Sequence, residues 1–273
     1  MELNRYCEAG DLAALQAYCA QANVTAAQIR EYHALQIACL NNHLEVAHWL
    51  HQTFELTGAD ARIVDNCALQ VACLVGHLEV ARWLQRTFLL DAKDARANDN
   101  CALRWACAHG HFEVARWLQQ TFHLTAADAR ADNNFALRMT CESGFLEVAS
   151  WLQLTFQLTA ADARAMDSYA LRWACQNKHI EIIRWLQRTW GIPPDMILMA
   201  IACVPANSAC AGYLRSLRPL TWSPRTHADF PLATRRLALL LLLVCQRLAR
   251  EPGALPSLPP ELWLHLLSFL PAW

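Results

Sequence analysis

The chain has 273 residues, of which 55% are hydrophobic and 17% are charged, and its formal net charge is -1 at pH 7. This composition excludes a disordered chain and gives no electrostatic reason to expect nucleic-acid binding. The start of the chain lacks the apolar core of a signal peptide, and the longest apolar run, Leu237–Cys245, is far shorter than the ~20 residues that cross a membrane. We therefore expect an intracellular, cytoplasmic protein with neither nucleic acid nor membrane as a partner.

A repeat of 34 residues organises most of the chain. Its markers are the tryptophans and cysteines at Trp49, Trp83, Trp117, Trp151 and Trp185, and at Cys39, Cys73, Cys107, Cys141 and Cys175. Similarity at one fixed period of this length is typical of a solenoid of stacked units. Because five of the twelve cysteines copy one position and no CxxC occurs, we expect buried, unpaired thiols in a reducing compartment.

The first segment, residues 1–24, is predicted to be an N-terminal capping half-repeat. It aligns with the second half of the unit, but Asp11 replaces the usual histidine, and Gln16 and Tyr18 stand where later copies are apolar or aromatic. A more polar end unit is what a solenoid needs to close its exposed face. The full repeats are expected at residues 25–192.

Each full unit is predicted to contain three helical pieces. In the third copy these are a helix Asn100–His109, a second helix that starts at Gly110 and runs to Phe122, and the connector LTAADARA. In the connector, Thr125 is followed three residues on by Asp128, a capping-box pattern that predicts a short helix. The chain has eight glycines, and none stands where a tight hairpin would need a positive φ.

The string ALRWACAHGHFEVARWL resembles the paired helices of the ankyrin repeat, whose usual pattern is TPLHxAxxxGHxxxVxxLL. The resemblance covers about residues 5–190. The chain departs from the pattern at the Thr-Pro-Leu-His start, which reads Cys/Phe/Tyr-Ala-Leu-Arg/Gln, and at the hairpin between repeats, which the connector replaces. The resemblance implies an all-α, ankyrin-like repeat solenoid that binds other proteins. The departures move the expected binding surface to the exposed side of the first helices and to the connector tips.

The C-terminal part is predicted to hold a degenerate repeat at 193–218, a proline-rich linker at 219–231 and a helical tail at 232–273. The string LPPELWLHLLSFL resembles the opening helix of an F-box, LPxELxxxILSFL. Ankyrin arrays that end in a truncated F-box form a viral and host-manipulating class of ubiquitin-ligase adaptors, which for a viral protein implies the host cytoplasm or nucleus. The resemblance implies that a Skp-type adaptor binds the tail through Pro259, Leu262, Leu266, Phe269 and Leu270.

Two other interpretations of the tail remain open. The spacing Leu241-x3-Cys245-x3-Ala249, followed by a Leu-Pro stretch, is similar to a SOCS box, which recruits elongin and cullin. Alternatively, the tail only caps the solenoid.

Catalytic and metal chemistry find no support in the motifs. Cys107, His109 and His111 lie close together, but Cys107 and His111 are repeat positions, so we expect the imidazole to bond neighbouring backbone at the helix start. The repeated Asp-Ala-Arg triplets favour caps and ion pairs between units. No phosphate loop, Ser-His-Asp order or HExxH is present. We therefore predict no enzyme activity, no catalytic residue, no metal site and no cofactor.

The positions that differ between copies give the candidate binding surface. These positions are the two residues that precede each Gly-His dipeptide and the residue one helical turn before them, and they lie on the same face of the first helix. The candidate target-binding residues are Arg104, Ala108, His109, Arg138, Glu142, Ser143, Arg172, Gln176 and Asn177. Their three arginines would suit an acidic peptide. The alternative is a solvated face whose residues have drifted.

Two function hypotheses result. The first is a protein–protein interaction module that serves as a substrate-recruiting adaptor of a cullin–RING (SCF-type) ubiquitin ligase, with an unidentified target on the repeats. The second is a plain ankyrin scaffold that binds or sequesters a partner.

Overall fold

The computed structural model describes residues 2–205 and 207–217, and every regular element in these ranges is an α-helix. The expected all-α class is confirmed for this part of the chain. Contacts between Cα atoms divide the chain into two compact units, 1–213 and 214–273. The linker 219–231 and the tail 232–273, with its predicted adaptor-binding residues, lie outside the described residues.

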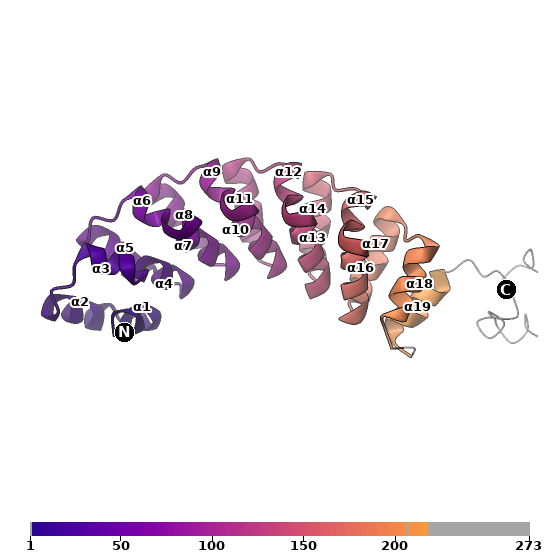
Figure 1. Cartoon of the computed structure of the whole chain (residues 1–273), viewed down its shortest axis with the longest axis horizontal. Helices are drawn as coiled ribbons and strands as arrows, with labels where there is room; N and C mark the ends of the chain where they lie inside the picture. The colour runs from indigo at the N-terminus through magenta and orange to yellow at the C-terminus, as the bar shows by residue number, and fades with distance from the viewer. Residues whose placement is uncertain (1, 206, 218–273) are drawn as a thin grey trace, which may run out of the picture. The chain divides into compact units, whose positions relative to one another are not determined.

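One three-helix unit recurs along the described chain (Figure 1). The first helices are α4 (Ala34–Leu40), α7 (Ile63–Leu74), α10 (Ala97–Ala108), α13 (Ala131–Ser143) and α16 (Ala165–Gln176). The second helices are α5 (Leu44–Thr53), α8 (Leu78–Phe88), α11 (Phe112–Phe122), α14 (Leu146–Phe156) and α17 (Ile180–Trp190). The predicted connector helices are confirmed as α3 (Ala26–Glu31), α6 (Gly58–Ala61), α9 (Ala92–Ala95), α12 (Ala126–Ala129) and α15 (Ala160–Ala163).

A helix pair stands at each end of this series. The segment 1–24 forms α1 (Glu2–Ala9) and α2 (Leu12–Gln21), and α1 packs on α4 much as α4 packs on α7. Residues 193–217 form α18 (Pro194–Ala202) and α19 (Ala209–Leu217). The N-terminal segment therefore has both helices of a unit, although α1 is shorter than the first helices that follow α4.

Small side chains allow neighbouring first helices to pack closely. Ala102 and Ala106 are fully buried on α10, and Leu103 between them fills the core. The five cysteines of the repeat position are also buried, as predicted. Burial raises the pKa of the Cys107 thiol far above its ordinary value, so this sulfur behaves as a small apolar group.

The start of each first helix after α4 differs from the prediction. Before α10 becomes right-handed at Cys101, the three residues Asn98–Asn100 take left-handed angles, with φ of 53°, 54° and 59°. The same left-handed turn occurs at 64–66, 132–134 and 166–168. The lack of glycine at these turns is therefore no argument against positive φ, because asparagine and aspartate also adopt it at low cost.

Val64 is the poorest fit to this turn. It is β-branched, has φ 53° and ψ 57°, and is 61% exposed, whereas the equivalent residues are Asn98, Asp132 and Met166. Replacing Val64 with asparagine is expected to stabilise the protein by about 1 kcal/mol, because strain is relieved and no buried contact is lost. The midpoint of urea unfolding measures this change.

The reverse substitution at the equivalent position is the matched control. Asn98→Val places the strained residue in the next turn, so it should lower the unfolding midpoint by a similar amount. Equal midpoints for the wild type, Val64→Asn and Asn98→Val would show that the turn is not left-handed.

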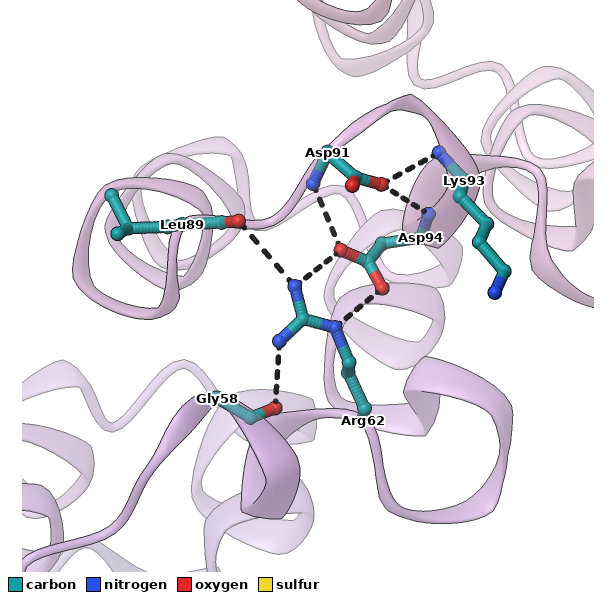
Figure 2. A network of polar contacts seen from close by, with 6 residues as sticks. All are labelled: Gly58, Arg62, Leu89, Asp91, Lys93 and Asp94. Atoms are coloured by element: carbon teal, nitrogen blue, oxygen red, sulfur yellow. Dashed lines mark hydrogen bonds and ion pairs between the residues drawn. The ribbon is translucent and has the colours of Figure 1, made fainter.

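Ion pairs between connectors join each unit to the next. In Figure 2, Arg62 donates from Nε and Nη2 to the two carboxylate oxygens of Asp94, both at 2.8 Å. Asp94 also accepts from the backbone N–H of Asp91 at 2.8 Å, and Arg62 Nη1 donates to the carbonyl of Gly58 at 3.1 Å. The other three pairs are Arg30–Asp60, Arg96–Asp128 and Arg130–Asp162. The Asp-Ala-Arg triplets thus form the inter-unit ion pairs that the sequence predicted, and Arg30, which is not part of a triplet, provides the cation of the first pair.

The repeated histidine also links units. The Nε2 atom of His111 bonds the carbonyl oxygen of Leu74 at 3.0 Å, and His77 bonds that of Leu40 at 3.2 Å. The imidazole therefore bonds backbone of the preceding unit and not of its own helix start. The His111 ring lies against a glycine of the preceding unit: a Cβ on Gly76, whose φ is 82°, would come within 2.4 Å of that ring. Gly76 therefore allows both the positive φ of the turn and the close approach of the His111 ring to the backbone.

Candidate functional site

The three predicted arginines of the first helices reach back to the left-handed turns. Arg138 donates from Nε to the carbonyl of Asn133 at 2.8 Å and from Nη2 to that of Asp132 at 3.1 Å. Arg172 makes the same two bonds, at 2.9 and 3.1 Å, to its own turn. Arg104 bonds the carbonyl of Asn98 and the carboxylate of Asp132. These side chains satisfy turn carbonyls, so they are not the open stripe that the sequence suggested.

Aromatic rings fill the space between these arginines. The ring centroids of Trp105 on α10 and Phe135 on α13 lie 5.4 Å apart. The guanidinium of Arg138 lies between two rings, 5.7 Å from the centroid of Phe135 and 5.0 Å from that of Tyr169. Tyr169 then contacts Trp173 on α16, with centroids 5.5 Å apart. Cation–π contacts of this kind hold each side chain in one orientation.

We call this surface the aromatic–arginine face. It spans three neighbouring first helices and comprises Trp105, Phe135, Arg138, Glu142, Tyr169, Arg172 and Trp173. All of these residues except Arg138 are partly exposed, so the rings are available to a partner. On α4 and α7 the matching positions hold only uncharged residues, among them Gln36, Ile37, Gln70 and Val71. The aromatic and charged groups are therefore confined to one half of the array.

A hydrogen bond between helices fixes the middle of the face. The Tyr169 hydroxyl donates to the Glu142 carboxylate at 2.7 Å. Burial, together with that hydrogen bond and the negative charge of Glu142, raises the pKa of Tyr169 to about 12. Arg138, whose guanidinium lies 5.0 Å from the centroid of the Tyr169 ring, and Arg172 both act to lower this pKa. Tyr169 therefore remains a neutral donor at physiological pH.

The other predicted residues of this region lie at its border. Ala108 is buried and offers no side chain to a partner. Ser143 and Gln176 are exposed. Asn177 is also exposed and donates from Nδ2 to the carbonyl of Glu142 at 2.8 Å, and His109 bonds the carbonyl of Trp105 through Nδ1 at 3.1 Å.

Sequence reasoning did not identify the aromatic residues of the face. The missed residues are Trp105, Phe135, Tyr169 and Trp173. They occupy two positions, four residues apart, at which the copies differ as clearly as at the positions selected: one reads Cys, Cys, Phe, Tyr and the other Val, Trp, Met, Trp. Comparison of the copies at these two positions would have located the face.

The described ranges, 2–205 and 207–217, contain neither a cluster of metal ligands nor a membrane-spanning helix. Within them, no three His, Cys, Asp or Glu side chains come together in a way that could hold a metal ion. None of the helices there has the length and apolar character needed to cross a bilayer.

The repeated helix pairs and their inter-unit bonds agree with the comparison to known families. Residues 35–128 match the ankyrin-repeat model, in three copies. This part of the chain holds ankyrin repeats. The match begins in α4 and ends in α12, and the same 34-residue period continues beyond it to Trp185. No curated protein matches the chain.

Ankyrin repeats indicate a protein–protein interaction module, and ankyrin-repeat proteins are typically scaffolds without enzymatic activity. In such an array the framework positions repeat, and the residues that face a ligand are free to differ. The aromatic–arginine face lies at positions that differ, so it is the candidate site for a partner.

Proposed function

We propose that the ankyrin repeats bind a target protein through the aromatic–arginine face. The observation that carries this proposal is the row of partly exposed rings on α10, α13 and α16, held in place by arginines that are themselves fixed on turn carbonyls. Rigid aromatic side chains contribute most of the binding energy at many protein interfaces, because little conformational entropy is lost when they are covered.

Removal of two rings from opposite ends of the face tests this proposal. The double variant Trp105→Ala, Trp173→Ala is expected to lose at least ~90% of target capture from cell lysate, since each truncated hot-spot residue costs about 2 kcal/mol or more. Captured proteins are quantified by mass spectrometry against the wild-type full chain. Circular dichroism confirms that the variant remains folded.

The control is Leu154→Ala on α14. Leu154 is the most exposed large apolar side chain of the second helices, at 73%, and lies on a different face. Its removal should leave the captured proteins unchanged. Should Leu154→Ala abolish capture while the Trp105, Trp173 double variant retains it, the target binds elsewhere on the array.

We further propose that the tail recruits a Skp-type adaptor, which makes the protein a substrate receptor of a cullin–RING (SCF-type) ubiquitin ligase. The support for this role is the sequence LPPELWLHLLSFL, which lies outside the described residues. The competing function is a plain scaffold that binds or sequesters a partner, with the tail as a cap. Affinity capture from cell lysate, with the full chain and with a variant that lacks residues 255–273, distinguishes the two functions. For a ligase receptor, deletion of these residues removes the adaptor from the captured proteins and leaves the target.

A further inference from the structure

Arg138 is the one buried arginine in the described ranges, with 8% of its surface exposed. Within residues 2–205 and 207–217 it forms no ion pair, and neither does Arg172 beside it. Arg104, at the equivalent position one unit earlier, is paired with Asp132. The aromatic–arginine face therefore has two cations at its α13–α16 end that have no carboxylate partner among the described residues.

The groups around these cations leave part of their charge uncompensated. The two carbonyl bonds use two of the five N–H groups of each guanidinium, and carbonyl dipoles and ring faces do not supply a full negative charge. The nearest acid on the face, Glu142, accepts the Tyr169 hydroxyl bond. Two positive charges against one negative charge leave the cluster Arg138, Glu142, Tyr169 and Arg172 with a net charge of about +1.

The residues around this cluster limit which kind of anionic ligand could neutralise its positive charge. Asp132 and Asp167 are exposed on the turns that Arg138 and Arg172 bond. These carboxylates would repel a polyanion such as a nucleic acid much more strongly than they would repel a single carboxylate. The adjacent rings of Tyr169 and Trp173 offer apolar contact beside that position.

We propose that this end of the face binds an aspartate or glutamate side chain of the target, followed by an apolar residue that packs on Tyr169 and Trp173. The inference rests on the proposed target-binding function and specifies its partner as an acidic peptide segment of a protein. Arg172, which is partly exposed, makes the direct contact with the carboxylate. The buried Arg138, whose guanidinium lies 5.0 Å from the centroid of the Tyr169 ring, adds to the attractive field.

A random 12-residue peptide library displayed on phage and selected on the immobilised full-length protein provides the probe. Selected peptides are expected to share an aspartate or glutamate next to an aliphatic or aromatic residue. A synthetic consensus peptide and its Asn/Gln counterpart are then titrated by fluorescence anisotropy. Arg172→Gln should weaken binding of the acidic peptide by about tenfold and leave the amide counterpart unchanged, since a charge-assisted hydrogen bond is lost only in the first case.

Arg188→Gln is the matched control, because it removes an exposed arginine from the last turn of α17 and should leave both affinities unchanged. Selected peptides that bind through Trp105 and Trp173 but contain no shared acid would overturn this inference and leave the proposed target-binding function intact. Binding that is insensitive to loss of both tryptophans, or a selection that enriches no peptide, would overturn both.

Discussion

Replacing Asp128 with alanine is expected to lower the free energy of unfolding by roughly 2–4 kcal/mol. The buried carboxylate of Asp128 accepts from Arg96 Nε at 2.8 Å and Nη2 at 3.1 Å, and from the N–H and hydroxyl of Thr125 at 2.7 and 2.9 Å. With alanine at position 128, the N–H and hydroxyl of Thr125 and the Nε and Nη2 groups of Arg96 lose this acceptor. Because the Arg96 side chain is 37% exposed, water replaces part of the interaction, which keeps the loss below that of a fully buried pair.

Urea unfolding followed by circular dichroism measures the loss. The control Glu113→Ala removes an exposed carboxylate from the surface pair with Arg116 on α11, and it should change stability by less than about 0.5 kcal/mol. Equal effects of the two substitutions would show that the connector pair is no more important than a surface ion pair.

The pH dependence of the same variant gives a second readout. Burial alone raises the pKa of Asp128, but hydrogen bonds from Arg96 and Thr125 more than reverse this, so the folded-state pKa lies below the ordinary value of about 4. A lowered folded pKa contributes stability that is present above the unfolded pKa and is lost as pH falls through the folded pKa. The wild-type melting temperature should therefore fall below pH 4, and that of Asp128→Asn should fall less.

The second large effect is expected in the tail. The double variant Leu266→Asp, Phe269→Asp should abolish capture of a Skp-type adaptor, because two charges would enter an apolar contact. These residues lie outside the described part of the chain, and the expectation rests on their place in LPPELWLHLLSFL. The melting temperature of the repeats should not change. Capture is measured with purified adaptor on the immobilised full chain.

The polar residues of the same stretch provide a control of equal charge. His265→Asp with Ser268→Asp also adds two carboxylates, but at positions that the helical pattern places with Glu261 on the polar stripe. Adaptor capture should survive this change. Should the Leu266, Phe269 variant unfold the repeats, the tail is a cap. Should the wild type capture no adaptor, the scaffold function stands and the ligase role fails.

The features that could be predicted from the sequence depend on local patterns. Ala106 and Leu103 recur at helical spacing, and Thr125 with Asp128 marks a helix start, so the two long helices and the connector helix follow from short-range rules. The ankyrin resemblance rests on the same spacing, and it is confirmed for residues 35–128.

The site was harder to predict because its contacts depend on structure that forms first. Arg138 bonds carbonyls that point toward it only after residues 132–134 turn left-handed, and no sequence rule applied to the connector anticipated that turn. Its contact with Tyr169 joins adjacent units and depends on how α13 and α16 pack. A stripe of arginines in sequence therefore looked like an open binding surface, although its members are largely engaged within the protein.

The connector ion pairs give the array a direction. In each of them the arginine belongs to the earlier unit and the buried aspartate to the following one, from Arg30–Asp60 to Arg130–Asp162. During synthesis, each new aspartate therefore meets a cation that the ribosome has already released, so units can join the growing stack in the order in which they are made. Removal of units from the amino end leaves a buried aspartate without its cation, whereas removal from the other end leaves only a solvated arginine.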